Sequence, residues 1–180
     1  MSYKQTLDYL FSQLPIFQRH GKAAYNKDLG KTIALCNAIG NPENDLKFVH
    51  VAGTNGKGSV CHILASVFKE AGFKTGLYTS PHLIDFRERI RINGDYISED
   101  FVVDFVAKHQ LAIEEIKPSF FELTFAMCLS YFKVKKVDIV VLETGMGGRL
   151  DSTNVVSPIL SIITNIGLDH QAYLGNTIMD

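Results

Sequence analysis

The chain has 180 residues, a length typical of one domain, and its 46% hydrophobic and 21% charged residues are the balance of a soluble globular protein with a sizeable core. This composition excludes disordered and collagen-like classes. Eighteen Lys and Arg residues against nineteen Asp and Glu residues leave a net charge of -1, which offers no broad electrostatic surface to nucleic acid or to an anionic membrane.

The three cysteines, Cys36, Cys61 and Cys128, are far apart and lie in apolar helical contexts, as expected of reduced thiols packed like small hydrophobic side chains. Residues 1–20 contain no long apolar run, which predicts neither a signal peptide nor a membrane span. Together these features indicate a cytoplasmic protein.

Hydrophobic spacing and turn residues predict the elements of the chain. In chain order they are a helix over 2–14, a helix over 29–39, a strand over 46–51, a glycine-rich loop over 53–59, a helix that ends near residue 72, a strand over 74–79, a charged segment over 81–96 with a hairpin turn at 93–95, a long amphipathic helix opened by Ser98 and Asp100, a helix over 119–135, a strand over 137–142 and a strand over 159–163.

Strands that alternate with helices predict an α/β fold, with a mostly parallel sheet covered by helices on both faces. The apolar runs of the last two strands are typical of strands covered on both faces. Ligands of such sheets bind outside the carboxyl ends of the strands. The residues at four strand ends are therefore candidates for a site, namely 53–59, 79–82, 143–145 and 164–170.

The glycine-rich loop over residues 53–59 is predicted to bind phosphate. Its glycines allow successive amides to point at an anion, the following helix adds its positive end, and Lys57 supplies a charge. The strict Walker pattern fails, because Val51 stands where its first glycine belongs and Gly58 follows the lysine. Ser59 is a candidate either for a magnesium ligand or for a helix cap. The alternative is a tight connection without a ligand.

Glu143 closes an apolar strand, a position that suits a carboxylate facing a cation such as magnesium. The alternative is a carboxylate paired with a nearby lysine or arginine. His170 follows a strand and, taken alone, is better explained as a hydrogen-bonded loop residue. Ser80, taken alone, indicates almost nothing.

Other polar positions have structural explanations. Ser119 and Glu122 form a helix capping box that encloses Phe120 and Phe121. The alternating charges of residues 87–91 are typical of a solvated edge, although two of their arginines could reach a phosphate or a carboxylate. His62, among apolar neighbours, is expected to be a satisfied structural residue.

Six strings, in this order, resemble the folylpolyglutamate synthase and dihydrofolate synthase family of Mur ligases. They are His50-Val-Ala-Gly-Thr-Asn-Gly-Lys-Gly-Ser59, Tyr78-Thr-Ser-Pro-His82, Phe86-Arg-Glu-Arg-Ile90, Glu143-Thr-Gly-Met-Gly-Gly-Arg-Leu-Asp151, Thr153-Asn154 and Asn165-Ile-Gly-Leu-Asp-His170. The resemblance implies a P-loop ATPase fold of the Mur ligase central domain, and ATP-dependent ligation of L-glutamate to a folate or dihydropteroate carboxylate through an acyl phosphate.

The resemblance also implies roles for individual residues, with ATP and Mg²⁺ as cofactors. The catalytic residues would be Lys57, Glu143 and His170. The metal ligands would be Ser80, Glu143 and His170. The ATP phosphates would be bound by Thr54, Asn55, Gly56, Lys57, Gly58 and Ser59. The pteroate would be bound by Ser119, Phe120, Phe121, Glu122, Leu150, Asp151 and Ser152, with a contribution from residues 26–29.

Members of that family continue considerably further, so residues 1–180 are expected to be the N-terminal part of the ATP-binding domain, without the rest of that domain or the C-terminal glutamate ligase domain. The expected partners are small molecules, with neither nucleic acid nor membrane, and the parent enzyme is expected to be monomeric. Two alternatives stay open, a peptidoglycan-type Mur ligase and, for this chain alone, a nucleotide-binding module without turnover.

Overall fold

The structure, a computed structural model, describes residues 1–15 and 28–178. In this part of the chain six strands form one sheet in the order β4-β3-β2-β5-β1-β6. Their bounds are β1 Phe48–Ala52, β2 Thr75–Tyr78, β3 Ile90–Ile92, β4 Asp95–Tyr96, β5 Ile139–Glu143 and β6 Leu160–Ile163. Strands β2, β5, β1 and β6 run parallel, and β3 and β4 add an antiparallel edge. The expected mostly parallel sheet is confirmed.

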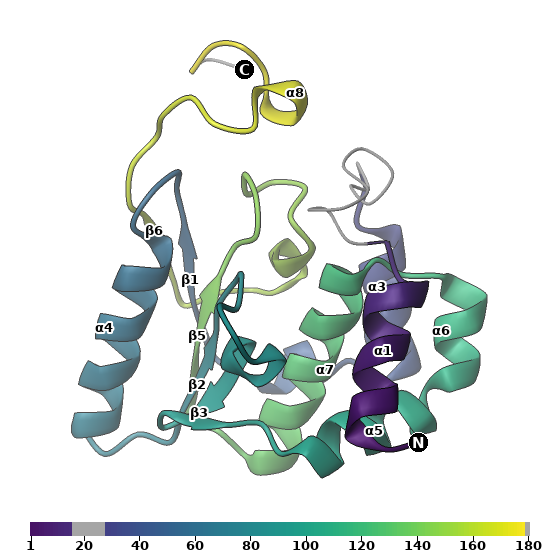
Figure 1. Cartoon of the computed structure of the whole chain (residues 1–180). Helices are drawn as coiled ribbons and strands as arrows, with labels where there is room; N and C mark the ends of the chain where they lie inside the picture. The colour runs from purple at the N-terminus through teal and green to yellow at the C-terminus, as the bar shows by residue number, and fades with distance from the viewer. Residues whose placement is uncertain (16–27, 179–180) are drawn as a thin grey trace.

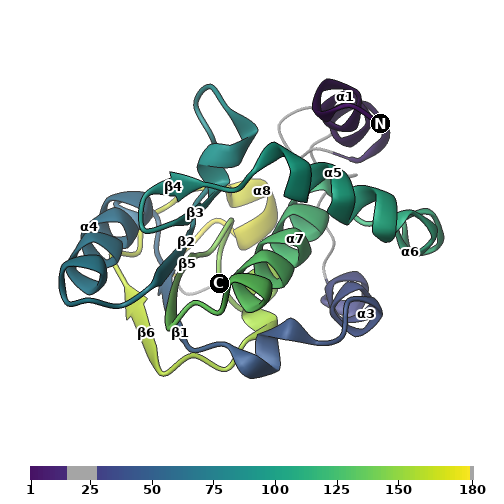
Figure 2. The same ribbon diagram turned by 90° about the horizontal axis from the view of Figure 1, so that it is seen from below.

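Helices cover the two faces of the sheet unequally (Figures 1 and 2). Helix α4 packs on one face, and α7 packs on the other with further helices outside it. The helices are α1 Tyr3–Gln13, α3 Gly30–Ala38, α4 Lys57–Glu70, α5 Glu99–Lys108, α6 Gln110–Ile116, α7 Phe120–Lys135 and α8 Gln171–Leu174, and short 3-10 helices lie at η2 Pro42–Asp45, η3 Phe86–Arg89 and η4 Ser152–Val155. Helix α7 is the middle layer on its side, and it is apolar around much of its circumference because neighbours surround it.

The core consists of two clusters, one on each face of the sheet. The larger one lies on the α7 side and includes Phe125, Phe132 and Leu142, and the smaller one joins α4 to the central strands through Val51 and Cys61. All three cysteines are buried and free, as the sequence indicated. Burial raises the pKa of the Cys61 thiol to about 12, which keeps it neutral and unreactive.

The hairpin turn expected at residues 93–95 and the helix start expected at Ser98 are confirmed. Ser2 caps α1 in a reciprocal capping box with Gln5, and the turn between β3 and β4 places both Asn93 and Gly94 at positive φ, 52° and 95°. The helix opened by Ser98 is interrupted at His109, where the backbone leaves helical geometry, so two helices replace the one long helix that was expected.

Strand β6 differs from its prediction as a strand covered on both faces. It pairs with β1 at the edge of the sheet, and Leu160 and Ile163 are 51% and 64% exposed. Of its residues only Ile162 packs against the core, so most of the apolar run is uncovered among the described residues. In the same part of the chain, none of the helices combines the length and the apolar character needed to span a membrane.

Candidate active site

The loop between β1 and α4 holds a conformation that its glycines permit. Gly53 has φ 135° and Gly56 has φ 82°, values that disfavour any side chain, and a Cβ added at Gly53 would collide with Thr164 Oγ1. Gly56 is also the N-cap of α4 and provides no side-chain cap. Ser59 is exposed within the first turn, so its interpretation as a helix cap is wrong. The uncapped first turn presents the amides and positive end that an anion requires.

Lys57 reaches back over this loop. Its Nζ donates to the carbonyl oxygens of Gly53 at 2.7 Å and of Thr54 at 3.2 Å. A lysine ammonium has three donors, so one is left for a ligand in addition to these two bonds. The charge is thereby fixed at the mouth of the loop.

The chain after β6 is tied directly to the same loop. Asn165 accepts the Thr54 amide with its carbonyl and the Asn55 amide with its side-chain oxygen, each at 2.9 Å. The Thr54 hydroxyl exchanges hydrogen bonds with the backbone of Gly167, and Thr164 Oγ1 donates to the Asn55 carbonyl at 2.7 Å. The role of Asn165 as a support for the loop was missed by sequence reasoning, because its partners lie more than a hundred positions earlier in the chain.

Glu143, at the end of β5, is joined to the end of β2. Its Oε2 accepts the Ser80 amide at 2.9 Å, and its side chain is 4% exposed. A Cβ at Gly58 would lie 3.6 Å from its Oε1, which places the carboxylate beside the first turn of α4. Burial raises the pKa of Glu143. No lysine or arginine nitrogen of the described residues lies within 4.0 Å, so the alternative of a direct ion pair is wrong.

These contacts fit a magnesium ion in part. Glu143 and Ser80 supply hard oxygen ligands beside the phosphate loop, and a magnesium ion keeps several waters and takes phosphate oxygens as further ligands. The described residues contain no group of three or more His, Cys, Asp or Glu side chains positioned to hold a metal by themselves. The protein would thus provide few of the ligands.

His170 follows strand β6 and does not share a cavity with Glu143. It has φ 48° and stands at the start of α8, which projects beyond the carboxyl ends of the strands (Figure 1). Its Nε2 lies 3.8 Å from Asp169 Oδ2. His170 and Lys57 line one cavity of about 460 Å³, together with residues 145–150 and much of 165–178, whereas Ser80 and Glu143 do not line it.

The stretch from Ser119 to Glu122 forms the expected capping box. The Ser119 amide donates to Glu122 Oε2 at 2.6 Å, and the Glu122 amide donates to Ser119 Oγ at 3.2 Å. Phe120 is 4% exposed, because it stacks on Phe11 at 5.3 Å between ring centroids and also contacts Phe86 and Arg89. Phe121 is half-buried at the edge of Tyr78 and keeps more of its ring accessible.

Asp151 organises the loop after β5. Its Oδ2 accepts the amides of Gly145 and Met146 at 2.9 and 2.8 Å, and its Oδ1 accepts the amide and hydroxyl of Thr153 at 3.0 and 2.6 Å. All four donors belong to Gly145, Met146 and Thr153, so Asp151 holds the loop of which it is part. His50 on β1 extends this network, with Nε2 at 2.8 Å from Thr153 Oγ1, and sequence reasoning assigned it no role. Leu150 and Ser152, beside Asp151, are half-buried.

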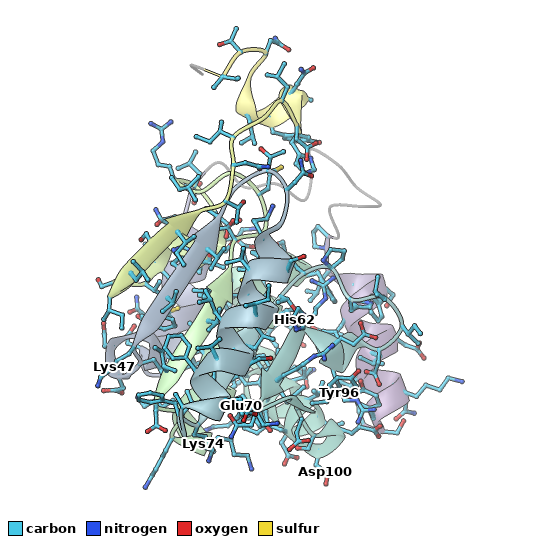
Figure 3. All side chains as sticks on the ribbon, turned by 90° about the vertical axis from the view of Figure 1, so that its left-hand side faces the viewer. Lys47, His62, Glu70, Lys74, Tyr96 and Asp100 are labelled. Atoms are coloured by element: carbon cyan, nitrogen blue, oxygen red, sulfur yellow. The ribbon has the colours of Figure 1, made fainter. Side chains whose placement is uncertain are left out.

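Two further sequence interpretations are corrected by the structure. Arg89 is 4% exposed and therefore does not belong to a solvated edge. His62 lies on α4 with its side chain exposed, and the described residues offer it no hydrogen bond, so it is not a satisfied structural histidine (Figure 3). Residues 26 and 27 of the predicted contribution from 26–29 lie outside the described residues.

Comparison with known proteins gives a consistent result. Residues 51–178 match the sequence model of the Mur ligase middle domain. The chain is 44% identical over 168 residues to the dihydrofolate synthase/folylpolyglutamate synthase of Bacillus subtilis, which covers 88% of this chain and 39% of that protein. It is 38% identical over 185 residues to the folylpolyglutamate synthase of Lacticaseibacillus casei, which covers 99% of this chain and 42% of that protein.

Solved structures show the same likeness. The apo form of L. casei FPGS superposes with a TM-score of 0.89 and 38% identity, over 99% of this chain and 43% of that one. E. coli FolC in complex with DHPP and ADP superposes with a TM-score of 0.87 and 34% identity, over 99% of this chain and 41% of that one. The chain thus spans about two fifths of the length of the relatives it matches.

Proposed function

The chain belongs to the Mur ligase family, on its folylpolyglutamate synthase and dihydrofolate synthase branch, and from this premise we propose that its protein joins L-glutamate to a folate or dihydropteroate carboxylate with ATP. In this reaction a carboxylate oxygen attacks the γ-phosphorus and ADP leaves. The amino group of glutamate then attacks the acyl phosphate, so that an amide forms and inorganic phosphate departs. The observation that carries the proposal is the grouping of four strand ends at one phosphate loop: hydrogen bonds tie the end of β6 to this loop, and Glu143 of β5, which accepts the Ser80 amide after β2, lies beside Gly58.

The phosphates of ATP are assigned to residues 54–59. The backbone amides at the start of α4 and the ammonium of Lys57 face the anion, and the Asn165 contacts hold the loop in place before the nucleotide arrives. Phosphoryl transfer depends mainly on positioning and charge neutralisation, which these groups provide without any covalent intermediate on the protein.

Ser80 and Glu143 are the proposed ligands of one magnesium ion, and His170 is the proposed ligand of a second. Bound Mg²⁺ neutralises charge on the phosphate oxygens. Glu143 is held for this purpose by the Ser80 amide, beside Gly58 at the start of the nucleotide-binding helix. The position of His170 in a cavity with Lys57 supports its assignment to the same nucleotide.

The pteroate is assigned to the surface formed by residues 119–122 and 150–152. Phe121 is the proposed ring for a flat pterin, since Phe120 is already enclosed by other side chains. Ser119, Glu122 and Asp151 shape this surface through their buried hydrogen bonds. The family includes relatives named for either or both of the dihydrofolate and folylpolyglutamate synthase activities.

Residues 1–180 are proposed to be the N-terminal part of the ATP-binding domain, and a C-terminal domain is proposed to complete the glutamate site. The proposed partners are ATP, L-glutamate and a folate or dihydropteroate, in a monomeric cytoplasmic enzyme that binds neither nucleic acid nor membrane. The buried free thiols and the net charge of -1 support this setting.

The decisive assay measures phosphate release and glutamylated product for the complete gene product that carries this sequence, with ATP, L-glutamate and either dihydropteroate or tetrahydrofolate. Release that requires both glutamate and a pterin substrate is expected. Phosphate release with neither substrate, or activity only with a uridine-nucleotide muramyl peptide, would overturn the proposal.

Lys57→Ala provides the variant for this assay. We expect ATP affinity to fall by about tenfold or more, because a charge-assisted contact contributes roughly 1.5–3 kcal/mol. Lys69→Ala is the matched control, since Lys69 is an exposed lysine in the last turn of the same helix. Equal ATP affinities for the two variants would contradict the role of Lys57.

A further inference from the structure

The three arginines of η3 and β3 have different surroundings. Arg87 is paired with Asp85 at 2.7 Å and with Glu99 at 3.3 Å. Arg91 donates to the Glu88 carbonyl at 3.0 Å and lies over the ring of Tyr96. Arg89 is the most buried of the three and has no carboxylate within 4.0 Å among the described residues. It is thus a buried cation without an anionic partner.

The contacts of Arg89 occupy only part of its guanidinium. Its Nε donates to His82 Nδ1 at 2.7 Å, and its guanidinium carbon lies 5.2 Å from the centroid of the Phe120 ring. The two terminal nitrogens have no acceptor in the parts of the chain that the structure describes, and they are not among the fully buried atoms that lack a partner, so they retain contact with solvent. Four N–H donors of the guanidinium therefore remain without an acceptor among the described residues.

Tyr78 provides a second, independent indication. Its hydroxyl is fully buried and has no hydrogen-bond partner among the described residues. Tyr78 lies opposite Ile90, the residue after Arg89. The phenol of Tyr78 interacts electrostatically with the guanidinium of Arg89. A buried phenol without an acceptor, near a guanidinium with unpaired terminal nitrogens, leaves this part of the fold short of oxygen acceptors.

The position of Arg89 relates it to the proposed reaction. The carbonyl of Arg89 accepts the Thr79 amide at 3.1 Å, directly before Ser80, and its charge interacts with Glu143. Its guanidinium lies over the ring of Phe120, and Phe121, the next residue, contacts the ring of Tyr78. Arg89 thus contacts both the strand end that leads to Ser80 and the start of the helix that carries Phe121, and the carboxylate of a pteroate must lie between these two places if it is to meet the γ-phosphate.

We propose that Arg89 binds the carboxylate of the aromatic substrate through its terminal nitrogens, held in position by His82 and Phe120. This inference rests on the proposed function and names the group that recognises its acid substrate. The planar fork of a guanidinium matches the two oxygens of a carboxylate. His82 receives the Nε–H on its Nδ1, which fixes one edge of the guanidinium and leaves the terminal nitrogens for the substrate.

The test compares two probes, pteroic acid and its carboxamide, by titration calorimetry on the complete gene product in the presence of magnesium and ADP. The wild type is expected to bind the acid about tenfold or more tighter than the amide. Arg89→Met is expected to lose this preference. Arg89→Lys, which keeps the charge without the planar fork, is expected to lose part of it, and Arg87→Met is expected to retain it as the matched control.

Three outcomes would overturn the assignment of Arg89. If Arg89→Met and Arg89→Lys both kept the full preference for the acid, the assignment of Arg89 would be overturned while the proposed function stood. If the wild type bound neither probe, both proposals would fall together. If both Arg89 variants lost magnesium–ADP affinity as much as acid affinity, Arg89 would be a counter-ion of Glu143 and the assignment would also fall. Thermal unfolding of every variant checks that it is folded.

Discussion

His50 links β1 to the loop after β5 through its bond to Thr153 Oγ1. Because the Thr153 hydroxyl donates to Asp151, His50 donates to Thr153 Oγ1 from Nε2, which is the protonated nitrogen when its imidazole is neutral. Burial lowers the pKa of His50, although the nearby Asp151 charge opposes the shift. The folded state therefore binds a proton at His50 less readily than the unfolded state does.

This shift predicts a dependence of stability on pH. The contribution of neutral His50 is fully present above its ordinary pKa of 6.5 and is lost as the pH falls below that value toward the lowered folded pKa. His50→Gln keeps a donor without titrating, so we expect its free energy of unfolding to fall less than that of the wild type between about pH 7.5 and 5.5. Chemical denaturation at a series of pH values measures both.

His109→Gln is the control for this experiment, because burial also lowers the pKa of His109 but that residue lies at the junction of α5 and α6, away from the loop. Only His50→Gln should also disturb the loop of residues 145–151. Identical pH dependence in the wild type and His50→Gln would contradict the prediction.

Among the elements, the entry to α4 depends on backbone conformation more than on side chains. Gly53→Ala is expected to weaken ATP binding about tenfold or more and to lower the melting temperature, because its Cβ would meet Thr164 and its φ of 135° is unfavourable for alanine. Ser66→Ala is the control, since Ser66 is exposed in the middle of the same helix and lies outside the loop. Thermal unfolding and ATP titration of both variants distinguish them, and equal losses would argue against the strained turn.

At the start of α7, the role of Ser119 as a helix cap can be tested separately from its proposed contact with the substrate. Ser119 caps α7 and Ser98 caps α5. The hydroxyl oxygen of each serine accepts a hydrogen bond from a backbone amide of its helix, at 3.2 Å for Ser119 and 3.3 Å for Ser98. Each serine-to-alanine change is expected to reduce the free energy of unfolding by about 1 kcal/mol. If residues 119–122 line the pteroate site, only Ser119→Ala also weakens pteroate binding. Unchanged pteroate affinity in Ser119→Ala would leave the capping role alone.

For the whole molecule, the chain spans 39% and 42% of the B. subtilis and L. casei relatives. We expect residues 1–180 to fold and to bind magnesium–ATP, but to show little or no glutamylation, because the glutamate site is proposed to lie largely in a further domain. A steady-state assay with ATP, glutamate and a folate measures this, with the complete gene product as the positive control. Robust glutamylation by residues 1–180 alone would contradict it.

The sequence by itself determined the parallel strands, most of the longer helices and the class of the fold. Alternating apolar runs, glycines after β1 and caps such as Ser98 act within a few positions, so their consequences were readable without the rest of the chain. The parallel arrangement followed as well, because right-handed crossovers bring the strand ends to one edge of the sheet. The grouping of the phosphate loop, Ser80 and Glu143 was therefore predictable as a neighbourhood.

Only the tertiary structure decided which side chains in that neighbourhood are already committed. Asp151 uses four hydrogen bonds to hold its own loop, Phe120 is enclosed by other aromatic rings, and β6 is exposed at the sheet edge. Arg89 differs from Arg87 although the two are separated by a single residue. Burial and pairing depend on partners distant in the sequence, and the spacing of residues along the chain does not specify them.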